Sequence, residues 1–280
     1  MGFRGLIVWL LFFSYVLLCS CRSSHHNGGT TRRGLGDILT KAMFEKMLPN
    51  ANNDSCPAKG FYTYEAFIAA AKSYPAFATT GSHEIRKREV AAFLGQTSFQ
   101  TAGGIGWTPS IGPYTWGYCT KKTDNPLTDY CQPNPRYPCA AGRNYYGRGP
   151  MQLSWNYNYG KFGETIGRKK DLLQNPDLLI KNVTMAFEAA IWFWMTPQPP
   201  KPSPHDVIIG NWHGDNEGRL PGYGVISNII DHEQCGIGAD TNVQDRILYY
   251  QRYCDMLGVG YGENTDCYSQ KPYPAILHEN

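Results

Sequence analysis

The stretch IRKREVAAFLGQTSFQT, residues 85–101, carries the clearest helical pattern of this sequence. The residues at helical spacing in it are Val90, Phe93, Leu94 and Thr97. Such a spacing places these side chains on one face of an α-helix, which then packs against a core. The glycine pair Gly103-Gly104 follows directly and predicts where the helix stops.

Three other stretches also favour helices. Thr63 can cap a helix that begins after it. The apolar face of that helix holds Phe67, Ile68 and Ala71. Residues 183–195 are apolar nearly all round, as in a buried helix, and residues 243–257 carry an apolar stripe before Gly258. The segments between are rich in Gly, Pro, Asn and Tyr, so we predict a mainly α fold whose long ordered loops wall a cleft.

The N-terminal residues 1–21 have the pattern of a secretory signal peptide. Arg4 supplies a positive charge, residues 6–18 are apolar, and Cys19-Ser20-Cys21 offers small residues for cleavage. An uncleaved anchor is the alternative, but the run is shorter than the ~20 residues of a membrane span. We expect a flexible tail over residues 22–36, one folded domain over residues 37–272 and a C-terminal tail over residues 273–280.

The composition is that of a globular protein. Hydrophobic residues make up 42% of the 280 residues and charged residues 18%, which suffices for a sizeable core. The net charge of +3 is too small to indicate a nucleic-acid partner, which needs a concentrated basic face. We therefore expect an exported monomer that has no nucleic-acid partner and, after signal cleavage, no membrane association.

Seven of the nine cysteines remain after cleavage of the signal peptide. An exported chain meets oxidising conditions, so pairing is expected and one thiol is left over. The spacings lack the C-x-x-C pairs of zinc sites, and we predict neither a metal nor a cofactor. Asn53 and Asn182 begin the glycosylation sequons Asn-Asp-Ser and Asn-Val-Thr.

Several motifs, in order along the chain, carry a family resemblance. They are KREVAAFLGQTS (87–98), GPYTWGYC (112–119), YYGRGPMQLSWNYNYG (145–160), WFWMT (192–196), QPPKP (198–202) and YYQRYCD (249–255). Together they resemble the plant chitinases of glycoside hydrolase family 19, without the cysteine-dense hevein-like module of some relatives. The resemblance implies a two-lobed, mostly helical, lysozyme-like fold with a long sugar-binding cleft.

The resemblance also implies how the cysteines pair. Six of them match the disulfide positions of the family, which pairs Cys56 with Cys119, Cys131 with Cys139, and Cys235 with Cys267. Cys254 matches the unpaired cysteine of the family. It lies on the apolar stripe of a predicted helix, so we expect it to be buried and inert.

The reaction of the family is inverting hydrolysis of β-1,4-linked N-acetylglucosamine. Inversion requires a carboxylic acid that protonates the leaving oxygen and a carboxylate that activates water on the opposite face. By resemblance, Gln100 occupies the place of the acid, next to Phe99 where the family has His, and Thr123 occupies the place of the base. An amide cannot release a proton near neutral pH, and a hydroxyl is a poor base. Asp124 is the nearest substitute carboxylate.

Most polar residues that contact sugar in the family have a match here. These are Gln152, Ser154, Tyr157, Asn158, Lys201 and Arg246, while Tyr137 stands where relatives often have a stacking Trp. The departures lie near the missing base. Asp231 replaces an Asn that helps to hold the attacking water. One residue is lost before Cys235, which leaves the positions of Glu233 and Gln234 open, and one residue is added between Gly104 and Pro113.

Three functions are compatible with these residues. The leading hypothesis is a secreted cell-wall or apoplastic protein that binds chitin, N-acetylglucosamine oligomers or a related wall glycan with little or no hydrolysis. The first alternative is an active endochitinase that uses Asp124, Glu233 or Asp231 as substitute carboxylate. The second alternative is a structural wall protein that does not bind chitin.

Overall fold

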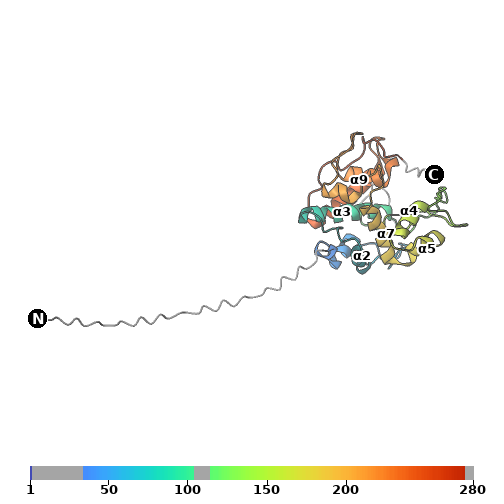
Figure 1. Cartoon of the computed structure of the whole chain (residues 1–280), viewed down its shortest axis with the longest axis horizontal. Helices are drawn as coiled ribbons and strands as arrows, with labels where there is room; N and C mark the ends of the chain where they lie inside the picture. The colour runs from blue at the N-terminus through green and yellow to red at the C-terminus, as the bar shows by residue number, and fades with distance from the viewer. Residues whose placement is uncertain (2–33, 104–113, 275–280) are drawn as a thin grey trace. The chain divides into compact units, whose positions relative to one another are not determined.

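A computed structural model describes Met1 and residues 34–103 and 114–274 (Figure 1). The predicted signal peptide, most of the predicted N-terminal tail and the added residue between Gly104 and Pro113 lie outside the described residues. Within those ranges, no helix has the length and apolar character that crossing a membrane requires.

The described residues form α-helices and short 3-10 helices joined by long loops. In chain order these are η1 (Leu35–Asp37), α1 (Lys41–Met47), α2 (Tyr64–Ala71), α3 (His83–Gln100), α4 (Asn156–Thr165), α5 (Lys169–Gln174), α6 (Leu178–Lys181), α7 (Val183–Met195), α8 (Pro204–Ile209), α9 (Tyr223–Ile230), η2 (His232–Gln234) and α10 (Thr241–Leu257). Isolated bridges are the only β pairing in this part of the chain. The prediction of a mainly α fold is confirmed.

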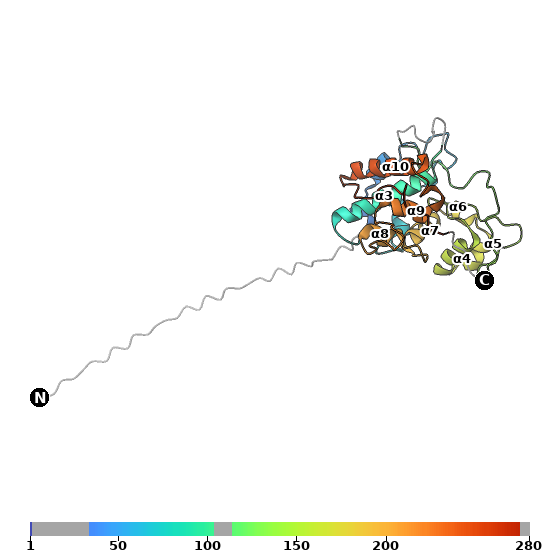
Figure 2. The ribbon, with the colours of Figure 1, turned by 90° about the horizontal axis from the view of Figure 1, so that it is seen from above.

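Helix α3 runs through the centre of the domain and packs along α10 (Figure 2). It begins where the Ser82 hydroxyl accepts a hydrogen bond from the Ile85 amide at 3.2 Å. Every residue from Val90 to Ser98 is buried. The two helices approach closely at Gly95, where an added Cβ would lie 3.0 Å from Cα of Tyr250. A side chain larger than hydrogen at position 95 would therefore push α10 away.

The sequence patterns locate four of the helices. α2, α7 and α10 occupy the predicted stretches, and the Thr63 hydroxyl caps α2 by accepting from the Ala66 amide at 3.2 Å. Six other α-helices lie in segments that the sequence suggested were loops. Helix α4 contains two glycines and two asparagines, which are weak helix formers. It forms because α5 and α7 pack against it, a tertiary effect that local propensity does not show.

Two hydrophobic clusters correspond to the two lobes. The larger one joins α1, α2, α3, α7, α9 and α10 around Phe67, Phe93 and Trp194. The smaller one joins α4, α5 and α6 around Tyr159 and Leu172. Leu35 and Tyr273 also belong to the larger cluster and are only 3% and 2% exposed, so the core extends slightly beyond the domain limits expected from sequence.

A buried carboxylate ties three helices of the larger lobe together. Glu89 on α3 is fully buried and accepts hydrogen bonds from the Trp194 indole of α7 at 3.0 Å and from the Ala78 amide at 2.9 Å. Nδ1 of His205 on α8 lies 2.5 Å from the same carboxylate. A buried charge without partners would be strongly destabilising, so these contacts make Glu89 structural. This carboxylate serves the fold and not the cleft.

The expected cysteine pairing is confirmed. Disulfides join Cys56 to Cys119, Cys131 to Cys139, and Cys235 to Cys267. Cys254 is free and fully buried on α10, and burial raises the pKa of its thiol to about 12. The reactive form of cysteine is the thiolate, so Cys254 is inert in the folded protein.

This arrangement predicts the alkylation pattern of the protein after signal cleavage. Iodoacetamide should modify no cysteine of the native protein, one cysteine after denaturation and seven after denaturation with reduction. Peptide mass spectrometry would assign the single modified residue to Cys254. A Cys254→Ala variant is the matched control and should lose the label that appears on denaturation. Modification of several cysteines under native conditions would contradict the pairing.

Candidate active-site cleft

A cleft of about 460 Å³ lies where residues of both lobes meet. Its lining comprises Gln100, Thr123, Tyr130, Gln132, Gly147, Met151, Gln152, Leu153, Ser154, Trp155, Tyr157, Asn158, Phe193, Gln198, Lys201, Ile229, Ile230, Asp231, His232 and Glu233. The cleft thus brings together eight of the residues predicted from sequence, from Gln100 at the end of α3 to Asp231 after α9. Asp124, Tyr137 and Arg246 are not in the lining.

Gln100 enters the cleft because α3 ends at this residue. The next residue, Thr101, is fully buried, and its hydroxyl donates to the Thr97 carbonyl at 2.6 Å and accepts from the Tyr118 amide at 2.8 Å. The Thr101 carbonyl also accepts from the amide of Cys119 at 3.0 Å. The end of α3 is therefore hydrogen-bonded to the segment that leads to Thr123. These contacts position Gln100 relative to that segment.

The Thr123 side chain faces Gln152 across the cleft wall. Its hydroxyl donates to Oε1 of Gln152 at 3.2 Å, and its amide donates to the Gly147 carbonyl at 2.9 Å. A Cβ on Gly147 would lie 2.7 Å from the Thr123 hydroxyl, so only glycine leaves room for this contact. The neighbouring Asp124 is exposed and outside the lining. The hydroxyl of Thr123 thus has Gln152, and not Asp124, as its hydrogen-bond partner.

Asn158 offers the cleft an unused acceptor. Its side-chain amide donates to the Ser154 carbonyl at 2.9 Å, and the residue is only 6% exposed. Its Oδ1 is buried and accepts no hydrogen bond from any residue that the structure describes. A buried acceptor without a donor is unfavourable, and a donor from a bound water or a ligand would satisfy it.

Asp231 is held in an ion pair at the cleft wall. Its Oδ2 accepts from Nη2 of Arg246 at 3.1 Å and from Nε2 of Gln234 at 2.7 Å. Arg246 is fully buried, and its guanidinium also donates to Gln96 of α3 at 2.7 Å. Arg246 therefore lies outside the cleft lining, and its guanidinium positions Asp231. The charge of Asp231 is compensated by this pairing.

Lys201 and Glu233 are the other charged groups of the lining. Lys201 is 7% exposed, its ammonium donates to the Ile229 carbonyl at 3.1 Å, and burial lowers its pKa to about 8. Burial also lowers the pKa of the adjacent His232, and the nearby Lys201 charge adds to this shift. Glu233 on η2 is exposed, and no described residue hydrogen-bonds to its carboxylate. The sequence had left the position of Glu233 open.

Tyr137 lies in the core of the smaller lobe rather than at the cleft surface. It is 4% exposed, and its hydroxyl donates to Glu164 at 2.8 Å. Its ring fills the space over Gly160, where an added Cβ would lie 2.3 Å away. Its side chain is thus packed, whereas the aromatic lining of the cleft consists of Tyr130, Trp155, Tyr157 and Phe193.

Sequence reasoning had singled out only Tyr157 among these four aromatic residues. Trp155 stands in the quoted motif, two positions before Tyr157, and Phe193 stands in another. Their place in these motifs was the available signal, but it does not tell which rings face the cleft. Tyr130 lies outside every motif, beside Cys131, and nothing in the sequence marked it.

The remaining predicted sites lie away from the cleft. Both sequon asparagines are exposed, and Asn182 also caps α7 by accepting from the Met185 amide at 3.0 Å. In residues 34–103 and 114–274, no group of three or more His, Cys, Asp or Glu side chains could hold a metal ion.

Comparison with known proteins identifies the family. Residues 38–267 match the family described as chitinase class I. The chain is 51% identical to endochitinase 1 of Theobroma cacao, covering 98% of this chain and 97% of that protein. It is 57% identical to inactive chitinase-like protein 1 of Hevea brasiliensis, and this match covers 90% of this chain and 82% of that protein. The crystal structure of the class IV chitinase from Zea mays matches with a TM-score of 0.65 and 32% identity, and this match covers 82% of this chain and 98% of that structure. The chain therefore belongs to glycoside hydrolase family 19.

Proposed function

We propose that this protein binds chitin, N-acetylglucosamine oligomers or a related wall glycan in its cleft, with little or no hydrolysis. The observation that carries the proposal is that Gln100 and Thr123, which the family resemblance assigns to the places of the acid and the base, both line the cleft. One relative is named an inactive chitinase-like protein, while others are named endochitinases, so the family contains both kinds.

The carboxylates of the cleft do not form an acid and base pair. Those in its lining are Asp231 and Glu233, which lie two residues apart on the same short segment. Inverting hydrolysis needs two carboxyl groups on opposite faces of the sugar. Asp231 is also paired with Arg246. Since each general acid or base typically contributes about 10²–10⁴-fold, losing both leaves binding and orientation without efficient chemistry.

The binding groups of the cleft persist without the carboxylates. Asn158 offers an unused acceptor, Lys201 a partly desolvated ammonium, and Tyr157 an aromatic ring. Amide, ammonium and hydroxyl groups match the acetamido and hydroxyl groups of N-acetylglucosamine. These groups favour binding over the alternative of a wall protein that no longer binds chitin.

We place this activity outside the cell, in the wall or apoplast, and expect a monomer. The N-terminal pattern of residues 1–21 is that of a secretory signal, and the three disulfides suit an oxidising compartment. The two exposed sequon asparagines are accessible to glycosylation. Immunolocalisation of the tagged full chain, together with analytical ultracentrifugation of the secreted form, tests both expectations.

One observation favours a second function, a slow chitinase that uses Glu233. Its carboxylate lines the cleft and has no partner among the described residues. Asp124 has no comparable support because it lies outside the lining. Any residual turnover of the wild type should therefore disappear in Glu233→Gln and survive in Asp124→Asn.

The proposal predicts the outcome of an activity assay. The wild type should hydrolyse N-acetylglucosamine hexamers far more slowly than an active family 19 enzyme measured in parallel. Gln100→Glu and Thr123→Glu should each help little alone, because inversion needs both groups. The double variant should exceed the wild type by at least ~10²-fold if the cleft geometry persists. Robust turnover by the wild type would overturn the proposal.

Binding is tested by calorimetry with the same hexamer. Asn158→Ala removes the unused buried acceptor together with its amide, which should cost about 1–3 kcal/mol and weaken binding roughly 5- to 150-fold. Asn211, which is exposed and outside the cleft, provides the matched control, and Asn211→Ala should leave affinity unchanged. Absence of wild-type affinity at millimolar hexamer would favour the structural alternative instead.

The lowered pKa of Lys201 predicts a pH dependence. With a pKa of about 8, its ammonium loses its proton between pH 7 and pH 9, so an affinity that uses this donor should fall across that window. Lys201→Met should bind more weakly and show no such fall. The unfolded chain keeps this proton up to about pH 10.4, so the same residue makes the folded state more stable as pH rises from 8 to 10. Calorimetry and thermal melts at pH 6, 8 and 9.5 measure both effects.

A further inference from the structure

We propose that Trp155 forms a sugar-stacking subsite of the cleft, on which one pyranose ring of a β-1,4-linked glycan lies. This inference deepens the proposed function and rests on it. It replaces the stacking role that the family resemblance assigned to Tyr137, whose ring is packed in the core of the smaller lobe.

Three aromatic rings form one continuous strip in the cleft. Trp155 and Tyr157 are nearly parallel, with an interplanar angle of 10° and ring centroids 6.3 Å apart. Tyr130 meets Trp155 edge to face at 5.2 Å. All three residues line the cleft, and Trp155 is partly exposed while Tyr157 is only 5% exposed. Trp155 and Tyr130 are therefore the partly exposed rings of the strip, and Trp155 is the one that contacts both of the others.

The indole of Trp155 also has an unused donor. No residue that the structure describes accepts a hydrogen bond from its Nε1, although the residue is partly buried. An aromatic face with a polar N–H at its edge suits a sugar ring, which presents C–H groups on its face and hydroxyls at its rim. A purely structural Trp would usually bury both the ring and the N–H against partners.

Backbone strain is concentrated at this part of the cleft. Of the eight non-glycine residues with positive φ among those described, three line the cleft: Tyr130 (φ 56°), Gln152 (φ 49°) and Trp155 (φ 73°). Positive φ is unfavourable for a residue with a bulky side chain, and it persists where the surroundings impose it. At Trp155, glycine would meet the backbone demand without strain, so the tryptophan side chain must contribute something that glycine does not.

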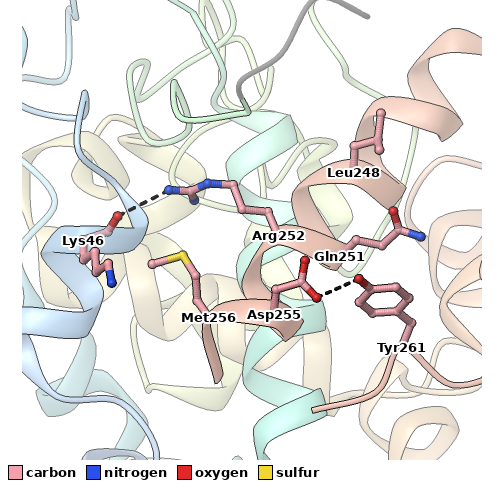
Figure 3. Close-up of a pocket in the computed structure, with 7 residues that line it drawn as sticks. All are labelled: Lys46, Leu248, Gln251, Arg252, Asp255, Met256 and Tyr261. Atoms are coloured by element: carbon pink, nitrogen blue, oxygen red, sulfur yellow. Dashed lines mark hydrogen bonds between the residues drawn. The ribbon is translucent and has the colours of Figure 1, made fainter. Parts of the chain in front are cut away.

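A second pocket of the domain is a useful contrast (Figure 3). It lies along α10 and its aromatic residue, Tyr261, is 36% exposed. There the Tyr261 hydroxyl already donates to Asp255 at 2.6 Å, and Arg252 donates to the Met47 carbonyl at 2.8 Å. Tyr261, Asp255 and Arg252 of this pocket are thus engaged within the protein. Tyr261 therefore serves as the matched control for an exposed ring outside the cleft.

The test combines calorimetry with tryptophan fluorescence on the full mature protein and N-acetylglucosamine hexamer. Trp155→Ala should weaken binding roughly 10- to 30-fold, whereas Trp155→Phe, which keeps a ring, should stay within about 3-fold of the wild type. Tyr261→Ala should bind like the wild type. The fluorescence change on hexamer binding should be largely absent in Trp155→Phe, although that variant still binds.

Each result separates the inference from the proposed function. If the wild type does not bind the hexamer, the proposed function fails and the inference with it. If the wild type binds and Trp155→Ala binds equally well, the inference alone is wrong. Should Trp155→Ala fail to fold by circular dichroism, Trp155→Phe decides: an undiminished fluorescence change in that variant would show that Trp155 does not contact the sugar.

Discussion

The buried guanidinium of Arg246 is the contact on which the cleft depends. It is fully buried and donates to Gln96 on α3, to Asp231 in the cleft lining and to Gln234 on η2, and it lies 4.2 Å from the centre of the Phe99 ring. A charge withdrawn from water needs several partners at once, so the three elements can hold only one relative arrangement. The end of α3, and with it Gln100, is placed by this requirement.

The supports of the cleft lie beside Gln100 and Thr123, the two positions that the family resemblance assigns to the catalytic carboxylates. Thr101 ties the helix end to residues 118–120, and Gly147 admits the Thr123 side chain. These contacts come from the backbone or from neighbouring residues, and none of them uses the side chain of Gln100. Under the proposed function, binding depends on the walls of the cleft, whereas hydrolysis depends on the side chains at these two positions.

The substitutions also change the electrostatics of the cleft. An enzyme of this class must hold two carboxyl groups in a partly desolvated site, which opposes their charged forms. An amide and a hydroxyl avoid that penalty, and Asp231 is neutralised by Arg246. Removing strained or poorly solvated catalytic groups commonly favours stability at the expense of activity. Lys201 and Glu233 are the other charged groups of the lining; the charge of Asp231 opposes the lowering of the Lys201 pKa, and that of Glu233 opposes the lowering of the His232 pKa.

Local pattern in the sequence determined the central helices, because apolar residues at helical spacing need only one face to be buried; α3, α7 and α10 follow from it. The cysteine pairing and the two substituted positions followed from the motifs that resemble the family.

Tertiary structure alone decided the rest. Helix α4 exists because α5 and α7 cover weak helix formers. Tyr137 is packed over Gly160, while Trp155 reaches the cleft through a backbone conformation that its sequence neighbours do not reveal. Asp231 became an ion-pair partner because Arg246, fifteen residues away, is buried beside it and cannot remain unpaired.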